Sequence, residues 1–190
     1  MEIYLAKEWE HALLAFVVKA AARCVAGKRK QRLDETVLNR ILYFAKRQGV
    51  PYLYKFELSY RGSFCVDMYS DLEYLKADGI IRDTSRKPNY TNYVSSENME
   101  ALLKMHRDEI AKYRKPIRAV VRALSPLKPE HLQLIANLDY VFQLEHAKNP
   151  KGPVRDAVVE RFLSVEKDKF HRKEVEQTYD VLQKAGLLAA

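Results

Sequence analysis

The side chains that could hold a metal ion do not form a known motif. His131, Asp139 and His146 can be grouped with the neighbouring Glu145, because residues 139 and 146 share a face of a predicted helix. Their spacing matches no established set of ligands, and solvated side chains are the simpler interpretation. We therefore expect no metal site.

The sequence also contains no clear catalytic group. Asp67 and Asp71 lie one helical turn apart, as paired carboxylates for acid–base catalysis can, but they also suit the polar face of a helix. Cys24 and Cys65 are 41 residues apart and belong to no paired-cysteine motif. No glycine-rich phosphate-binding loop is present. We expect neither catalysis nor a cofactor.

Basic residues are the stronger signal, because they could hold the phosphates of a nucleic acid. One group surrounds a predicted hairpin, and a second opens a predicted helix over 171–185, where contacts with a DNA groove are usually made. Gln177 on that helix could read a base edge. A solvated helix face is the alternative, and Glu174 and Glu176 favour it. The candidate nucleic-acid-binding residues are Arg82, Arg86, Lys87, Lys169, Arg172, Lys173 and Gln177.

The first half of the chain predicts helix, helix, strand, helix and hairpin, over residues 8–25, 35–48, 53–60, 64–78 and 82–94. Asp34 is the expected N-cap of the second helix, and Gly79 the expected left-handed residue after the third. This order is typical of a winged helix-turn-helix. The third helix would present Asp67, Asp71 and Glu73 to phosphates, so the hairpin suits DNA better.

The second half is entirely helical in prediction. Residues 97–124 form one long helix or two shorter ones, with a kink or restart at Pro116, and carry seven Lys or Arg. A linker at 125–129 separates units 1–124 and 125–190, and further helices cover 130–147, 153–165 and 171–185. Segments 74–81 and 181–188 share one pattern: an apolar residue and Leu, then three residues, Gly and two aliphatic residues. The match indicates either an internal repeat or only that many helices end in a glycine cap.

The composition is that of a basic globular protein. The chain has 190 residues, 33 Lys and Arg against 25 Asp and Glu, and a net charge of +8. Such a charge attracts polyanions, although many basic proteins bind no nucleic acid. No apolar run reaches the ~18 residues of a membrane span. Because the start lacks a signal-peptide pattern and cysteines are few, we expect a cytoplasmic protein.

Several stretches carry a family resemblance: residues 38–45, 49–52, 56–62 and 71–81, and in the second half 169–170, 175–182 and 186–188. They resemble the YwgA-like proteins and, more distantly, the Panacea domain of SocA-type antitoxins. The family tends to have Tyr-Gly-Pro after its strand, where this chain reads Tyr60-Arg61-Gly62-Ser63. The resemblance implies a helix-rich, winged-helix-like fold and no known enzymatic activity.

The combined expectation is a mainly α fold with a small β component, winged helix-turn-helix-like, with one or two such units. The expected function is regulation through double-stranded DNA without catalysis. The alternative is a protein-interaction module, antitoxin-like or adaptor, on the same scaffold without DNA. The first helix, from Trp9 to Cys24, could serve a homodimer in either case. We expect no membrane partner.

Overall fold

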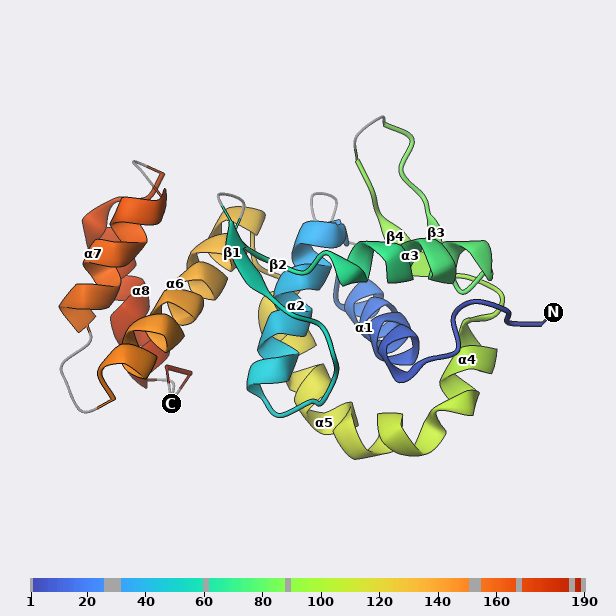
Figure 1. Ribbon diagram of the computed structural model, residues 1–190. Coiled ribbons are helices and arrows are strands. Elements are labelled where there is room, and N and C mark those ends of the chain that lie inside the picture. The colour runs from blue at the N-terminus through green and yellow to red at the C-terminus, as the bar shows by residue number, and fades with distance from the viewer. Residues whose placement is uncertain are drawn as a thin grey trace. The chain divides into compact units, whose positions relative to one another are not determined.

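The computed structural model describes residues 2–25, 32–59, 62–87, 90–150, 155–166, 169–184 and 187–188. These residues form a mainly helical fold with a small β component, as predicted (Figure 1). Its two sheets are separate antiparallel pairs, β1–β2 and β3–β4. The helices are α1 (Trp9–Val25), α2 (Glu35–Arg47), α3 (Asp67–Ala77), α4 (Met99–Met105), α5 (Arg107–Leu124), α6 (Pro129–Lys148), α7 (Arg155–Glu166) and α8 (Arg172–Lys184), and the strands are β1 (Glu57–Ser59), β2 (Gly62–Phe64), β3 (Ile81–Asp83) and β4 (Tyr93–Ser95).

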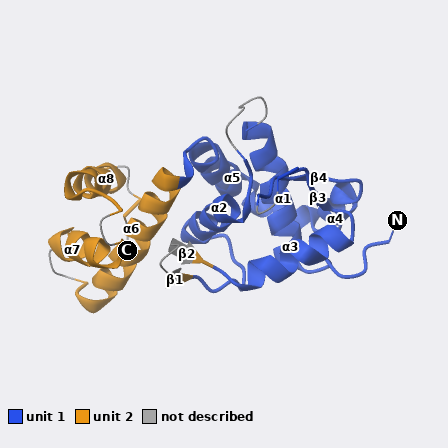
Figure 2. Cartoon of the chain, turned by 90° about the horizontal axis from the view of Figure 1, so that it is seen from above, with its two compact units in different colours: residues 1–56, 65–129 blue, residues 57–64, 130–190 orange. Residues whose placement is uncertain are grey.

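The chain divides into two compact units (Figure 2). The first comprises residues 1–56 and 65–129, and the second comprises residues 57–64 and 130–190. The β1–β2 hairpin thus groups with the second unit although it lies between α2 and α3 in the sequence. Of the motifs named above, Tyr60 and Arg61 of the family stretch 56–62 and Gly186 of the segment 181–188 lie outside the described residues.

Helix α1 forms the centre of the first unit. It packs against α2, α3, α4, α5 and β4, and every residue from His11 to Val18 is buried. Most of the apolar stripe that could serve a homodimer is therefore covered by neighbours within the unit, whereas Trp9, Ala20 and Cys24 at its ends stay half-buried. A homodimer through this helix stays a prediction. The stripe is long enough to pack against several elements of its own unit. Sequence periodicity shows that a helix face is apolar but does not show which elements cover it.

Local signals correctly place both ends of α2 and the C-terminal end of α3. The predicted start of α3 at residue 64 is wrong, because Phe64 pairs with β1 and the helix begins at Asp67. Asp34 caps α2 by accepting a 3.0 Å hydrogen bond from the Val37 amide. Gly49 and Gly79 have φ values of +79° and +63°. Only glycine adopts this left-handed region without strain, so each helix ends where the sequence predicts.

The strand predicted over 53–60 is much shorter in the structure. β1 holds only Glu57–Ser59 and pairs with Gly62–Phe64, in register Leu58 with Ser63. The alternating tyrosines before it are buried against helices instead. The Tyr52 hydroxyl bonds with the Leu42 carbonyl and the Lys46 amide, and the Tyr54 hydroxyl bonds with Asp71.

The helix expected over 97–124 breaks at His106 rather than at Pro116. His106 has φ −110° and ψ 34°, and its Nε2 lies 2.7 Å from the Lys7 carbonyl oxygen. Pro116 lies inside α5, which continues through it. The helix breaks where His106 contacts the N-terminal segment. Local sequence pattern does not identify a contact between residues so far apart in the chain.

The β3–β4 hairpin is fastened to the start of α2. Its register pairs Arg82 with Val94. The Tyr93 amide donates to the Leu33 carbonyl at 2.9 Å, and the Tyr93 hydroxyl donates to Glu35. The base of the hairpin is therefore held against the helical body of the first unit.

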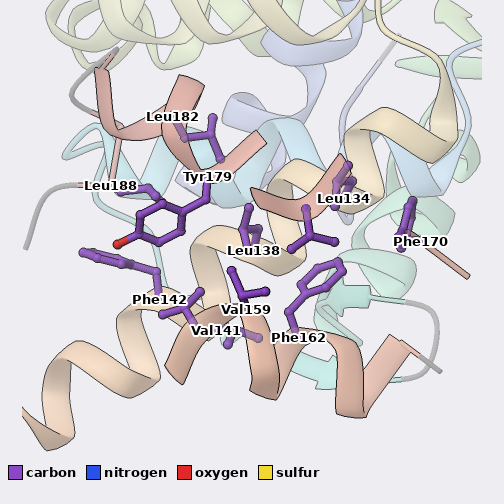
Figure 3. Close-up of a cluster of buried hydrophobic side chains, with 12 residues drawn as sticks. Leu134, Leu138, Val141, Phe142, Val159, Phe162, Phe170, Tyr179, Leu182 and Leu188 are labelled. Carbon is purple, nitrogen blue, oxygen red and sulfur yellow. The ribbon is translucent and has the colours of Figure 1, made fainter. Parts of the chain in front are cut away.

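The helical part of the second unit has its own apolar core. Figure 3 shows the side chains of α6, α7 and α8 converging, with the rings of Phe142 and Tyr179 in an edge-to-face contact, 6.3 Å between their centres. Phe162 is completely buried and lies 5.7 Å from the ring of Phe170. The Leu187 amide bonds to the Leu182 carbonyl at 2.9 Å, as the Ile80 amide does to Leu75 at 2.8 Å. The two matched sequence segments thus share this helix-ending hydrogen bond.

Candidate nucleic-acid interface

A groove of about 530 Å³ lies between α1, α4 and α5 in the first unit. Counting the described residues alone, its rim carries one acid, Glu100, and seven cations. We call it the basic groove. Its cationic residues are Lys19, Arg23, Lys104, Arg107, Arg114, Arg118 and Arg122.

Helical periodicity explains why these side chains meet. On α5, Arg114, Arg118 and Arg122 are spaced four residues apart, so they lie on successive turns of one face. On α1, Lys19 and Arg23 have the same spacing. Because α1 packs directly against α5, the two rows border one groove.

Most of the rim charge is not neutralised by acidic side chains. Lys19 forms an ion pair with Glu100. Among the residues that the structure describes, the other six cations of the basic groove have no ion-pair partner. Arg23, Lys104, Arg107, Arg114, Arg118 and Arg122 are also exposed, so they are free to bind an anion from solution.

A second hollow continues the basic surface along α5. It measures about 450 Å³ and is bordered by Arg114, Lys115, Arg118 and Arg122. Ala111 and Ala119 form its apolar part. Cations therefore extend around α5 beyond the groove itself.

The hairpin residues predicted from the sequence are exposed. Arg82, Arg86 and Lys87 are all accessible to solvent. The neighbouring tyrosines differ: Tyr93 is 2% exposed, whereas Tyr90 is 48% exposed with the Arg32 guanidinium 4.1 Å from its ring centre. Tyr93 is therefore unable to act as a stacking platform, and one face of Tyr90 is already occupied.

The α8 residues predicted from the sequence lie in a different setting. Arg172 bonds with Glu160 of α7 at 2.7 Å and lies 3.7 Å from Glu176. The hydrogen bond with Glu160 raises the pKa of Arg172 above its usual value. These carboxylates already neutralise Arg172, so a phosphate would have to displace them.

Of the other residues predicted around α8, one forms a hydrogen bond and two are exposed to solvent. Lys169 donates to Gln133, and its ammonium group lies 5.7 Å from the ring centre of Phe170. Lys173 and Gln177 are exposed. The hairpin set and the α8 set belong to different units, and the basic groove lies with the hairpin set in the first.

The residues considered for metal binding and acid–base catalysis serve other contacts. His146 stacks on Phe142 with ring centres 5.6 Å apart, and Glu145 pairs with Arg161 at 2.9 Å. Asp71 bonds with Tyr54 and lies 3.2 Å from His11 Nε2. Over the described parts of the chain, no group of three or more His, Cys, Asp or Glu side chains is arranged to hold a metal.

The basic groove is the feature that sequence reasoning missed. Its signal is present, because residues 110–124 contain five cations and no acid. The sequence does not show which way the basic face of this helix points. It also does not show that α1 packs beside it. Only the packing of α1 against α5 turns two separate rows into one surface.

Comparison with models of protein families and with curated proteins found no match. The resemblance to the YwgA-like and Panacea families therefore stays a prediction. None of the described helices has both the length and the apolar character needed to cross a lipid bilayer.

Proposed function

We propose that this protein is a non-catalytic regulator that binds double-stranded DNA, with phosphates held by the cations of the basic groove and of the adjoining face of α5. The observation that carries the proposal is the set of six exposed rim cations without ion-pair partners in the described structure. A protein that neutralises phosphates releases condensed counterions, which makes such a surface favourable for a polyanion.

The dimensions of the α5 row suit a phosphate backbone. With a rise of 1.5 Å per residue, Arg114, Arg118 and Arg122 are about 6 Å apart along the helix axis. The row from Arg107 to Arg122 spans about 22 Å, or roughly two thirds of the ~34 Å turn of B-DNA. Because the rim consists of cations, we expect contacts that position the duplex and carry little sequence information.

The winged-helix arrangement of the first unit is part of this proposal. The hairpin β3–β4 would act as the wing, with Arg82, Arg86 and Lys87 as further phosphate contacts. Helix α3 would not enter a DNA groove, because Asp67 and Glu73 are exposed on it and would be repelled by phosphates.

The experiment is fluorescence anisotropy with a labelled random 30-base-pair duplex, titrated at several salt concentrations. The triple variant Arg114→Gln, Arg118→Gln, Arg122→Gln is compared with Arg155→Gln, Arg161→Gln, Arg172→Gln. Both remove three positive charges, but the second set consists of residues that are paired with carboxylates. Each phosphate contact contributes about 0.9 to the slope of log K against log salt.

We expect the α5 triple variant to lower the magnitude of that slope by about 3 and to weaken binding at low salt. The paired set should change the slope by less than about 1. Equal losses in both variants would mean that net charge alone attracts DNA, which contradicts the assignment of the site. No binding by the unaltered protein at low salt would contradict the function.

A further inference from the structure

The floor of the basic groove is apolar, which phosphate binding does not require. Phe16, Ala20 and Cys24 come from α1, Leu103 from α4, and Ile110 and Val121 from α5. We propose that the groove binds an acidic amphipathic helix of a protein partner. This inference goes beyond DNA binding and uses the same rim cations.

The shape of the floor supports a helix as the occupant. Phe16, Ile110 and Val121 are 6%, 3% and 1% exposed, so they form a base that is already packed. Ala20, Cys24 and Leu103 are half-buried and remain to be covered. Since Ala20 and Cys24 are small, an apolar side chain from outside can approach α1 closely. Apolar side chains at i, i+4 and i+7 of a bound helix form such a contact row.

The charges around the floor determine the character of that helix. Lys19 and Arg23 lie on the α1 rim, and Arg114, Arg118 and Arg122 on the α5 rim. A helix that buries its apolar stripe on the floor would therefore bring its two flanking positions toward cations on both sides. Glu or Asp at those positions gives charge complementarity, which favours association and disfavours basic partners.

The length of the groove sets the length of the partner segment. The α5 row from Arg107 to Arg122 extends about 22 Å, which corresponds to roughly 15 helical residues. A volume of about 530 Å³ holds the apolar side chains of one helix face, while the rest of the helix stays in solvent. A free helix of this length is marginal in water, so the segment would gain order on binding.

The test uses the whole chain and a designed 16-residue peptide with Leu along one helical face and Glu on both sides of it. A control peptide has the same composition in scrambled order, so its Leu residues no longer share a face. Each peptide carries a fluorophore, and binding is followed by anisotropy. We expect the patterned peptide to bind at least about tenfold more tightly than the scrambled one.

The protein variants separate the groove from its charge. Ala20→Arg blocks the floor while adding a cation, so it should weaken the patterned peptide at least about tenfold, whereas the added positive charge should strengthen rather than weaken duplex binding. Ala123→Arg makes the same change at an exposed position of α5 that does not line the groove, so it should not weaken binding of the patterned peptide. If Ala20→Arg fails to fold by circular dichroism, Leu103→Ser replaces it.

Cys24 allows the bound peptide to be located. A patterned peptide with one Leu changed to a pyridyl-disulfide-activated Cys should form a disulfide with the Cys24 thiol and release thiopyridone. The buried Cys65 should not react. Cys24→Ser should abolish the adduct seen by mass spectrometry.

The outcomes distinguish this inference from the proposed function. Equal binding of patterned and scrambled peptides, or an unchanged affinity in Ala20→Arg, would overturn the helix-binding groove. Duplex binding without patterned-peptide binding would leave the DNA proposal standing and remove this one. Binding of the patterned peptide that is lost in Ala20→Arg, together with no duplex binding by the unaltered protein, would support the helix-binding groove and contradict the DNA proposal.

Discussion

The Oδ2 atom of Asp78 accepts a 2.8 Å hydrogen bond from the backbone amide of Ala6, 72 residues earlier in the chain. The same oxygen accepts from the amides of Leu5 at 2.7 Å and Tyr4 at 3.1 Å. One carboxylate at the end of α3 therefore fastens the segment that leads into α1. Since α1 is the centre of the first unit, this contact bears directly on stability.

We predict that Asp78→Ala lowers the free energy of unfolding by about 1–3 kcal/mol, because the buried Ala6 amide and the part-buried amides of Leu5 and Tyr4 lose a charged acceptor. Urea unfolding monitored by the fluorescence of the single Trp9 measures the change. Asp67→Ala, at an exposed position of the same helix, should alter stability by less than about 0.5 kcal/mol. Equal effects of the two substitutions would contradict the role of Asp78.

Asp78 should also contribute to acid sensitivity. Burial by itself raises the pKa of this carboxyl, but the amides of Ala6, Leu5 and Tyr4 outweigh it and lower the pKa below its usual value. A lowered pKa in the folded state gives stability that is present above the unfolded value of about 3.9. That stability is lost as the pH falls through the folded pKa. As the pH is lowered from about 5 to 2, the free energy of unfolding should therefore fall less steeply for Asp78→Ala than for the unaltered protein.

The two described left-handed glycines offer a matched pair. A Cβ at Gly49 would have no atom within 4 Å, whereas a Cβ at Gly79 would lie 2.7 Å from Glu97 Oε1. Gly49→Ala should cost about 1 kcal/mol through backbone strain alone. Gly79→Ala should cost somewhat more, because the exposed Glu97 carboxylate must also move away from the new Cβ.

A double variant isolates the second contribution. In a Glu97→Ala background, Gly79→Ala should cost the same as Gly49→Ala, within about 0.5 kcal/mol. Thermal or urea unfolding of the unaltered protein, the three single variants and the double variant measures this difference. A Gly79→Ala cost that is unchanged by removal of the Glu97 side chain would assign the effect to the backbone instead.

We expect the buried hydroxyl of Tyr54 to make the protein less stable at alkaline pH. Burial of its ring, followed by its hydrogen bond with Asp71, raises the pKa of Tyr54 well above the usual value of about 10. A raised pKa in the folded state gives stability that is present below the unfolded value and is lost at higher pH. Tyr54→Phe should therefore reduce the decline in unfolding free energy between about pH 9 and 11. An identical decline in Tyr54→Phe would exclude this tyrosine as its source.

The α8 group provides a further comparison for DNA binding. Arg172→Ala with Lys173→Ala should weaken duplex binding less than the α5 triple variant, because Glu160 and Glu176 already occupy Arg172. The ion pair between Arg172 and Glu160 is exposed to solvent, so its loss should change the stability of the fold little. A salt slope reduced more by the α8 pair than by the α5 triple variant would place the phosphate contacts in the second unit.

The sequence determines the features whose causes are local. Asp34, Gly49 and Gly79 mark helix ends through hydrogen bonds and backbone angles within a few residues, so their positions can be predicted. The helical character of the second half follows from its periodic apolar residues in the same way. The row of Arg114, Arg118 and Arg122 on one face of a helix is likewise a property of spacing alone.

Tertiary structure decides what those faces meet. The tyrosines before β1 alternate as in a strand, yet the body of the first unit buries Tyr52 and Tyr54, and the strand shrinks to three residues. Arg172 looks free in the sequence, but α7 brings Glu160 to it. The α5 cations become one side of a groove because α1, some 90 residues earlier, packs beside them. Spacing fixes which side chains share a face, whereas long-range packing fixes whether that face is buried, neutralised or open to a ligand.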